Sequence, residues 1–431
     1  MIKLFQSLGR PHIALWVIAS ALATFFLFWT LENLSPDRPP LWRGLPVSFR
    51  DSSNVRVFDR VLEHIESKTP PWLFERPEAA NITAWRNAAI AAPNSPSLYS
   101  DAIWPMLRAM GPSHFEADLP NSTLKVGEVL TLGPPRRGDV PAVSSFKDFA
   151  GLGGTFIVFD GATYVVQDVD PGSPAAGAGV SPGARVFDVH AKSLTPPPSQ
   201  RVSISLRQEI GSRLQIISYD FSPEIEEKSL YVKDMKDGRS YIRFSEFERD
   251  IKHELIQAIR SCPSRGLIFD LRMNIGGRAD VLRWVAGAFL GHGQVVAERV
   301  GTDGSRVERT RGRQAPCSAP VAVLIGPRTS SAAELLADAL RHHGRAVLVG
   351  DRTSGRVLES HEITLPDGGR LRIPVADVIA ASGARLEGVG VYPDVVAKAS
   401  PESLAAGEDA VLMAALAELD KAPKSNQGPS N

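Results

Sequence analysis

Residues 266–277 read GLIFDLRMNIGG, a short apolar strand that ends in an aspartate and is followed by two adjacent glycines. The chain then repeats this alternation of apolar strands and helical patterns, with helices expected at 279–290 and 331–343 and strands at 321–325 and 346–349. Strands and helices alternating at this spacing predict a mostly parallel sheet with covering helices. A hairpin turning at Asp367-Gly368 is expected to follow.

Composition limits the classes of function. A chain of 431 residues is long enough for two to four domains. Lys plus Arg and Asp plus Glu number 48 each, so no excess charge indicates a nucleic-acid partner. The two cysteines, Cys262 and Cys317, supply neither a disulfide framework nor a zinc site. One bridge and two buried thiols both remain open for this pair.

The N-terminus carries a run of 19 uncharged, largely apolar residues, Ile13 to Leu31. A helix of this length crosses about 30 Å of hydrocarbon. Basic residues precede the run and acidic residues follow it, which predicts a cytoplasmic N-terminus and an exported, periplasmic bulk. A cleaved signal peptide is the alternative. Because the small residues lie inside the apolar run, an uncleaved single-pass anchor in the inner membrane is favoured.

The pattern of apolar residues, glycines and prolines along the sequence divides the chain into five parts. They are a stub, anchor and tether at 1–41, an N-terminal helical domain at 42–133, a small β-rich domain at 145–222, an α/β core at 229–398, and a C-terminal helix with a disordered tail at 399–431.

The β-rich part opens on a glycine-rich turn, Gly151-Leu152-Gly153-Gly154. Main-chain amides in such a turn are suited to a peptide carboxylate. A Pro-Gly-Ser-Pro-Ala turn at 171–175 and a Pro-Gly turn at 182–183 follow in order. This combination resembles a PDZ domain, and the resemblance implies an edge groove that takes polypeptide segments or protein C-termini by β-augmentation.

Two turns of the α/β core are candidates for chemistry. The glycines that follow Asp270 sit where a strand of an open sheet ends, and their amides are candidates for half of an oxyanion hole. A tight strand-to-helix turn explains the same residues. Ser331 and Glu334 match the capping box of an ordinary helix. A serine at a helix N-terminus is also suited to be a nucleophile, because the helix dipole stabilises negative charge beside it.

Taken together, the motifs resemble those of the C-terminal-processing (tail-specific) serine peptidases. After the PDZ-like unit come Asp-Leu-Arg-x-Asn-x-Gly-Gly, Ser-Ala-Ala-Glu, Gly-Asp-Arg-Thr-x-Gly, Leu-Pro-Asp-Gly and Glu-Gly-x-Gly-Val-x-Pro-Asp, together covering about residues 145–397. The resemblance implies a ClpP/crotonase-like mixed sheet with covering helices and no metal or cofactor. It implies Ser331 as nucleophile, with the amides of Ala332 and of Gly276 or Gly277 binding the oxyanion.

One position departs from that pattern. The best-known members carry a lysine base directly after the Gly-x-x-Thr-x-Gly loop, where this chain has Arg356. An arginine stays protonated and does not act as the base. The chain is therefore either a catalytically inactive binding or scaffold protein, or an enzyme whose base lies elsewhere.

A tricorn-like branch of the same superfamily supplies an alternative base. The step Ser113-His114 follows an amphipathic helix and resembles the serine-histidine step of that branch, and Glu387 lies in the last motif. We therefore expect His114 to be the base, with Ser113 and Glu387 holding and polarising the network. The sequence thus predicts a membrane-anchored, extracytoplasmic serine endopeptidase, with the inactive scaffold as the alternative.

Overall fold

The computed structural model describes residues 53–111, 113–120, 154–159, 163–169, 180–188, 202–210, 213–221, 230–312 and 316–422. The predicted anchor, the glycine-rich turn at 151–153 and the predicted disordered tail lie outside these ranges. No helix within the described residues is long and apolar enough to cross a membrane.

A six-stranded sheet forms the centre of the α/β core, in the order β16-β13-β12-β9-β8-β7. Its strands pair in parallel except for β7 with β8. Their bounds are β7 Leu230–Asp234, β8 Ser240–Phe244, β9 Leu267–Asp270, β12 Val321–Ile325, β13 Val347–Gly350 and β16 Val395–Val396. Every residue of β9 and β12 is buried, as expected for strands covered on both faces. The predicted mostly parallel sheet is confirmed.

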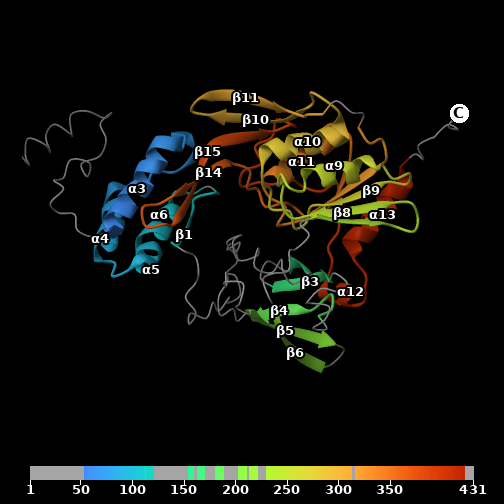
Figure 1. The fold of residues 1–431 in the computed structure, drawn as a ribbon, viewed down its shortest axis with the longest axis horizontal. Helices are drawn as coiled ribbons and strands as arrows, with labels where there is room; N and C mark the ends of the chain where they lie inside the picture. Colours follow the sequence, from blue (N-terminus) through green and yellow to red (C-terminus); the bar gives the residue numbers. More distant parts are fainter. Residues whose placement is uncertain are drawn as a thin grey trace, which may run out of the picture.

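Helices cover both faces of this sheet (Figure 1). One face packs against α9 (Lys252–Arg260), α10 (Ala279–Leu290) and α11 (Ala332–His342). The other packs against α12 (Pro401–Ala405) and α13 (Ala410–Lys421). The predicted helices at 279–290 and 331–343 therefore correspond to α10 and α11. Helix α11 buries nine of its residues, so the turn that precedes it is firmly placed on the sheet.

A second sheet, which the sequence did not predict as a separate unit, is antiparallel and has the order β1-β15-β10-β11 with β14 beside β15. Its strands are β1 Glu116–Asp118, β10 Val295–Gly301, β11 Gly304–Arg309, β14 Glu359–Thr364 and β15 Arg370–Ala380. The predicted hairpin is β14 and β15. Strand β15 is long enough to enter two cores, because Leu371 and Ile373 pack among the N-terminal helices while Val378 packs in the α/β core.

The N-terminal region is helical, as predicted, and builds its core around β15 (Figure 1). Its elements are α3 Ser53–Lys68, η3 Pro71–Leu73, α4 Ala79–Ala91, α5 Ser95–Leu98, η4 Tyr99–Ile103 and α6 Trp104–Ala109. The apolar stripes predicted from helical spacing are buried, including Phe58, Val61 and Met106. Because β1 then pairs with β15, the chain leaving α6 is tied to the α/β core.

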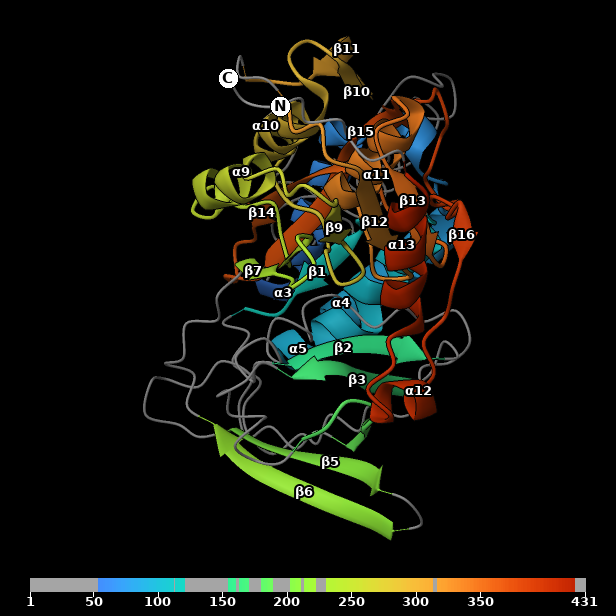
Figure 2. The same cartoon turned by 90° about the vertical axis from the view of Figure 1, so that its right-hand side faces the viewer.

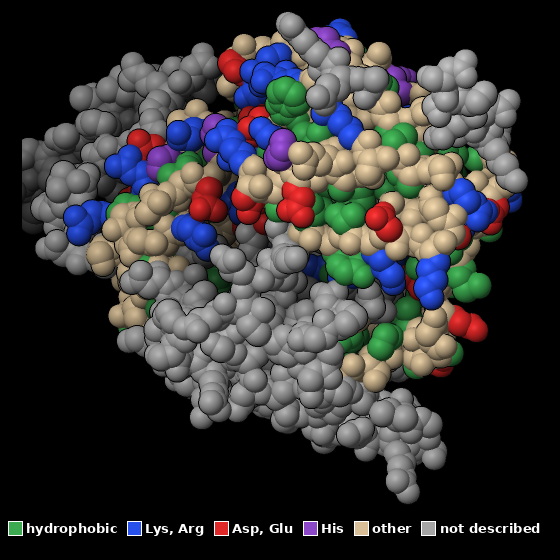
Figure 3. Space-filling model, turned by 45° about the vertical axis from the view of Figure 1, so that its right-hand side comes forward, with side chains coloured by type: hydrophobic (Ala, Val, Ile, Leu, Met, Phe, Trp, Pro, Cys, Tyr) green, Lys and Arg blue, Asp and Glu red, His purple; other side chains and the backbone are tan. Residues whose placement is uncertain are grey.

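The β-rich region forms a five-stranded antiparallel sheet in the order β2-β3-β4-β5-β6. The strands are β2 Gly154–Phe159, β3 Thr163–Val169, β4 Arg185–Asp188, β5 Val202–Ile210 and β6 Arg213–Phe221. Figure 2 shows α12 beside β3, so the sheet approaches the α/β core at this helix. On the face shown in Figure 3, basic and acidic side chains are interspersed.

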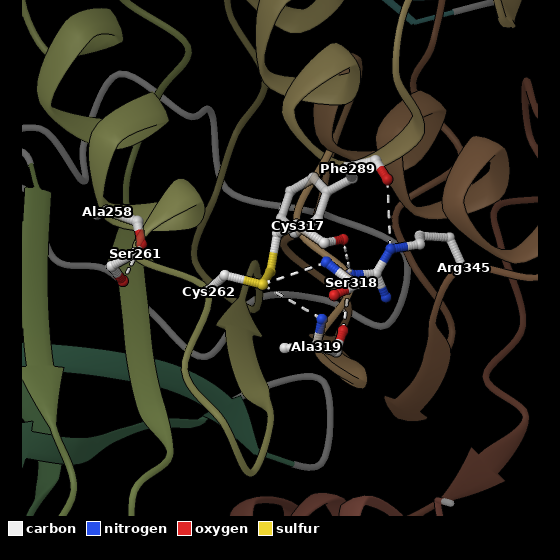
Figure 4. Close-up of a disulfide and its surroundings, with 8 residues drawn as sticks. All are labelled: Ala258, Ser261, Cys262, Phe289, Cys317, Ser318, Ala319 and Arg345. Carbon is white, nitrogen blue, oxygen red and sulfur yellow. Dashed lines mark hydrogen bonds between the residues drawn. A yellow bond between two sulfur atoms is a disulfide. The ribbon is translucent and has the colours of Figure 1, made fainter. Parts of the chain in front are cut away.

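Cys262 and Cys317 form a disulfide that joins the end of α9 to the segment entering β12 (Figure 4). The amides of Ser318 and Ala319 point at the sulfur of Cys262, at 3.1 and 3.3 Å. Of the two possibilities left open by the sequence, the bridge is the one formed. Disulfides of this kind persist mainly in oxidising compartments.

We predict that replacing both cysteines, in Cys262→Ser/Cys317→Ser, lowers the free energy of unfolding. The bridge closes a loop of 55 residues, and cross-linking a loop of that length is worth about 4 kcal/mol through the entropy of the unfolded chain. Urea unfolding monitored by circular dichroism measures the change. Dithiothreitol should destabilise the wild type and leave the double variant unaffected. Two reactive thiols in the unreduced, unfolded wild type would contradict the pairing.

Candidate active site

Ser331 lies at the end of a turn that connects β12 to α11, at the carboxyl end of the central sheet. Thr329 fixes the turn from within, because its hydroxyl donates to the carbonyl of Leu271 at 2.8 Å and accepts from the amide of Gly326 at 3.0 Å. The residues around Ser331 are buried, whereas Ser331 itself is partly exposed. The turn therefore presents one serine to the outside from a rigid base.

The backbone of Ser331 separates it from an ordinary helix cap. An N-cap residue normally has an extended conformation, but Ser331 has φ 55° and ψ −122°. Within the described residues only three non-glycine residues have positive φ, namely His114, Cys262 and Ser331. Such a conformation costs about 1–3 kcal/mol and persists only where the surroundings impose it. Two of these three strained positions are thus the predicted nucleophile and the predicted base.

Glu334 is the group that imposes the turn. Its carboxylate is fully buried and accepts five hydrogen bonds. The donors are the amides of Ser331 (3.0 Å), Gly355 (2.8 Å) and Arg356 (2.9 Å) and the hydroxyls of Thr353 and Ser354. Burial raises the pKa of Glu334, and these donors oppose the rise. The capping box predicted from the sequence is present, but most of the donors to its carboxylate come from another loop.

Of the glycine pair after β9, Gly276 lies directly against the serine, and Gly277 lies against the main chain of Phe247. A Cβ on Gly276 would come within 2.6 Å of the Cβ of Ser331, so only glycine fits there. The Gly276 amide donates to the Oδ1 of Asn274 at 2.9 Å. Within the described residues, no acceptor is present for the amides of Gly277 and Ala332. Of the three predicted oxyanion donors, Gly276 is therefore engaged elsewhere, and Gly277 and Ala332 remain.

Buried polar residues hold this glycine turn in place. Asn274 donates to the carbonyl of Phe244 and accepts the amide of Gly276, while its own carbonyl accepts the amide of Ser330. Upstream, Asp270 accepts from Arg272 and from the Tyr241 hydroxyl. Burial raises the pKa of Asp270, but Arg272 and Tyr241 outweigh it and the pKa is lowered. The polar residues of the Asp-Leu-Arg-x-Asn motif thus have structural roles.

The loop after β13 and the loop that carries Glu387 interlock. Gly355 has φ 70°, and a Cβ there would come within 2.8 Å of the amide of Gly390. Thr353 exchanges hydrogen bonds with the main chain of Val391, at 2.6 and 3.0 Å. These contacts bring two motifs that are about 30 residues apart in sequence into one layer beside Ser331.

Glu387 and Ser113 meet as predicted, but through the main chain. One carboxylate oxygen of Glu387 accepts the amide of Ser113 at 2.9 Å, and the other accepts the amide of Val357 at 3.0 Å. The hydroxyl of Ser113 lies 2.6 Å from Nδ1 of His114. Glu387 therefore positions the serine-histidine step through main-chain amides, and the hydroxyl of Ser113 forms the hydrogen bond to the imidazole.

The environment of His114 favours a neutral imidazole. Burial, followed by the charge of Arg356, lowers the pKa of His114 to about 4, with Glu116 opposing. When Nδ1–H donates to the Ser113 hydroxyl, Nε2 carries the free lone pair that a general base needs. Neither His342 nor His343 belongs to this site, since His343 bonds the carbonyl of Val295 at the far end of α11. His361 is largely exposed on β14, as predicted.

Arg356, at the position of the expected lysine, has its own partner. Its guanidinium forms an ion pair with Glu116, two residues after His114, and Arg372 lies 3.4 Å from the other oxygen of Glu116. Glu116 was missed in the sequence, because nothing in its local pattern distinguishes it from a surface glutamate. Among the residues that the structure describes, no cluster of His, Cys, Asp and Glu is placed to bind a metal ion.

Residues 239–397 match the profile of peptidase family S41. The chain is 28% identical to a carboxy-terminal-processing protease of Bartonella bacilliformis over 59% of this chain and 62% of that protein. It is 25% identical to the carboxy-terminal processing protease CtpA of Bacillus subtilis over 58% of this chain and 56% of that protein. The chain thus spans less than two thirds of the length of these curated relatives.

Solved structures show a similar fold. The photosystem II D1 C-terminal processing protease aligns with a TM-score of 0.52 and 19% identity, over 85% of this chain and 97% of that one. Mature CPAF, in complex with lactacystin, aligns with a TM-score of 0.53 and 12% identity, again over 85% and 97%. At these identities the likeness concerns the arrangement of the elements.

We predict that Glu334→Gln lowers the free energy of unfolding by about 2–3 kcal/mol, because an amide nitrogen would then face main-chain N–H donors in a buried place. Both carboxylate oxygens accept from amides, so either orientation of glutamine leaves donors unpaired. Urea unfolding at pH 7 measures the loss. Glu254→Gln, on the exposed side of α9, is the matched control and should change stability by less than about 0.5 kcal/mol. If Glu334→Gln were as stable as the wild type, the carboxyl of Glu334 would be protonated. The hydrogen bonds around it would then not depend on a negative charge.

Proposed function

We propose that the chain is a membrane-anchored, extracytoplasmic serine endopeptidase that binds polypeptides through its PDZ-like region and cleaves them with Ser331. The observation that carries the proposal is that two residues with a strained backbone conformation are held by the same group of loops. Ser331 and His114 both have positive φ, and each is attached to the same layer of loops, Ser331 through Glu334 and His114 through Ser113 and Glu387.

The proposed reaction starts at His114. Its Nε2 takes the proton of the Ser331 hydroxyl while the oxygen attacks the carbonyl carbon of the peptide bond. The amides of Ala332 and Gly277 donate to the resulting oxyanion. When the carbon–nitrogen bond breaks, the imidazolium gives its proton to the leaving amine. Water, deprotonated by the same imidazole, then hydrolyses the acyl-serine and restores the enzyme.

Substrate delivery is assigned to the sheet β2-β3-β4-β5-β6. Strand β2 follows the predicted carboxylate-binding turn and, among the described strands, pairs only with β3, and we assign its other edge to an added peptide strand. The resemblance to a PDZ domain and the names of the relatives support protein C-termini as the segment captured.

Export to the periplasmic side is supported by two features. The apolar run Ile13 to Leu31 has the length and flanking charges of a membrane anchor. The Cys262–Cys317 disulfide is the kind of bond that an oxidising compartment maintains.

We expect a fluorophosphonate probe to label the full chain in detergent at Ser331. Labelling should be absent in Ser331→Ala and slower by about 100-fold or more in His114→Ala, because removal of a general base costs that much. Ser100→Ala and His361→Ala, both at exposed positions, are matched controls and should label at the wild-type rate. A wild type that is not labelled, with or without added peptide, would favour the inactive scaffold. Normal labelling of His114→Ala would remove His114 from the mechanism.

The pH dependence follows from the lowered pKa of His114. The base is active when neutral, and with a pKa of about 4 it stays neutral from pH 8 down to about 5 and is protonated as the pH falls through 4. The labelling rate should therefore be nearly flat over that range and half-maximal near pH 4. Rates measured between pH 4 and 8, with circular dichroism confirming the fold at each pH, test this. A midpoint near 6.5, the ordinary value for histidine, would contradict it.

A further inference from the structure

Arg356 contacts two parts of the molecule, one through its main chain and the other through its side chain. Its main-chain amide donates to Glu334 at 2.9 Å, so its backbone is part of the layer that holds Ser331. Its side chain forms the ion pair with Glu116 on β1, which belongs to the segment that carries His114. The arginine is mostly buried, with a side-chain exposure of 19%. The residue at the expected lysine position thus connects the nucleophile's loops to the histidine's segment.

Glu116 is held from both sides. Arg356 pairs with one carboxylate oxygen and Arg372 with the other, and Arg372 is also the β15 residue opposite Glu116 in the β1–β15 register. Burial would raise the pKa of Glu116, but the two guanidinium groups, Arg356 foremost, outweigh it and the pKa is lowered. Glu116 is therefore ionised at neutral pH and bridges two cations.

These contacts lie on either side of the strained histidine. On one side of His114, the amide of Ser113 is held by Glu387. On the other side, Glu116 is held by Arg356. A residue with φ 70° returns to an ordinary conformation unless its neighbours are fixed. The two anchors fix the residue before His114 and the second residue after it, and both are joined to the loop at 353–357, since Glu387 also accepts the amide of Val357.

We propose that Arg356 is a positioning residue, which holds His114 in its strained conformation next to the Ser331 layer by pairing with Glu116. The inference rests on the proposed function, since it assigns a role within that catalytic arrangement. The same arginine contributes a positive charge beside the imidazole, together with Arg372, and Glu116 is the opposing negative charge. Arg356 thus has a geometric and an electrostatic effect on the base, without being a base itself.

The test is the pH profile of fluorophosphonate labelling for Arg356→Gln, on the full chain in detergent. Loss of the ion pair should slow labelling at pH 7.5 by about 10-fold or more, since misplacing a catalytic group by about 1 Å can cost that much or more. Loss of the positive charge should also move the acid midpoint upward, by about one pH unit. A residue with a merely structural role would reduce the rate and leave the midpoint unchanged.

Two variants make the outcome specific. Glu116→Gln removes the opposing charge, so it should slow labelling as well but not move the midpoint upward. Arg370→Gln removes a neighbouring arginine of β15 that lies near Glu362, and it should match the wild type in rate and midpoint. Urea unfolding of each variant identifies any that fail to fold.

The results separate the two proposals. A wild type that is labelled, with an Arg356→Gln variant that is folded and keeps the wild-type rate and midpoint, overturns the role of Arg356 alone. An upward shift in Arg356→Gln that Glu116→Gln does not share supports it. A wild type that is never labelled overturns the proposed function and this role with it.

Discussion

The buried carboxylate of Glu334 is the group on which the rest of the site depends. It is fully buried and stays in place because five donors surround it. A buried charge is expensive unless it is hydrogen-bonded on all sides, so these donors are constrained as strongly as the carboxylate. One donor is Ser331 and the others belong to residues 353–356. The helix that begins after Ser331 and the loop that follows β13 are thereby made into one unit.

Strand β15 extends this unit to the N-terminal region. Its first half packs among the N-terminal helices and its second half in the α/β core, so the two cores share one continuous strand. The segment that carries His114 enters β1, which pairs with β15. A histidine that lies more than 200 residues before Ser331 in the sequence is thus attached to the same layer of loops. The strain at His114 and Ser331 is supported by contacts that neither residue makes alone.

Arg356 shows how the side chain at a motif position can change in chemistry while the main-chain contact of that position is kept. Its amide donates to Glu334, a contact that any residue other than proline would make. Only its side chain differs in kind from a lysine, because a guanidinium stays charged. A permanent cation cannot act as a base, but it is well suited to hold an anion in a partly buried place. Catalytic loss and a new positioning role are therefore both compatible with the substitution, and the ion pair with Glu116 is the observation on which the proposed positioning role rests.

Much of the fold was determined by the sequence alone. Apolar strands at 267–270 and 321–325, helical periodicity at 279–290 and the Asp367-Gly368 turn act locally, so the central sheet, α10, α11 and the β14–β15 hairpin were all predicted. Ser331 and the glycine pair were also found from local motifs. The antiparallel second sheet, the Cys262–Cys317 bridge and the pairing of Arg356 with Glu116 were decided by tertiary structure. Each joins segments distant in sequence, and the energy of such a contact depends on burial and orientation, which residue patterns do not encode.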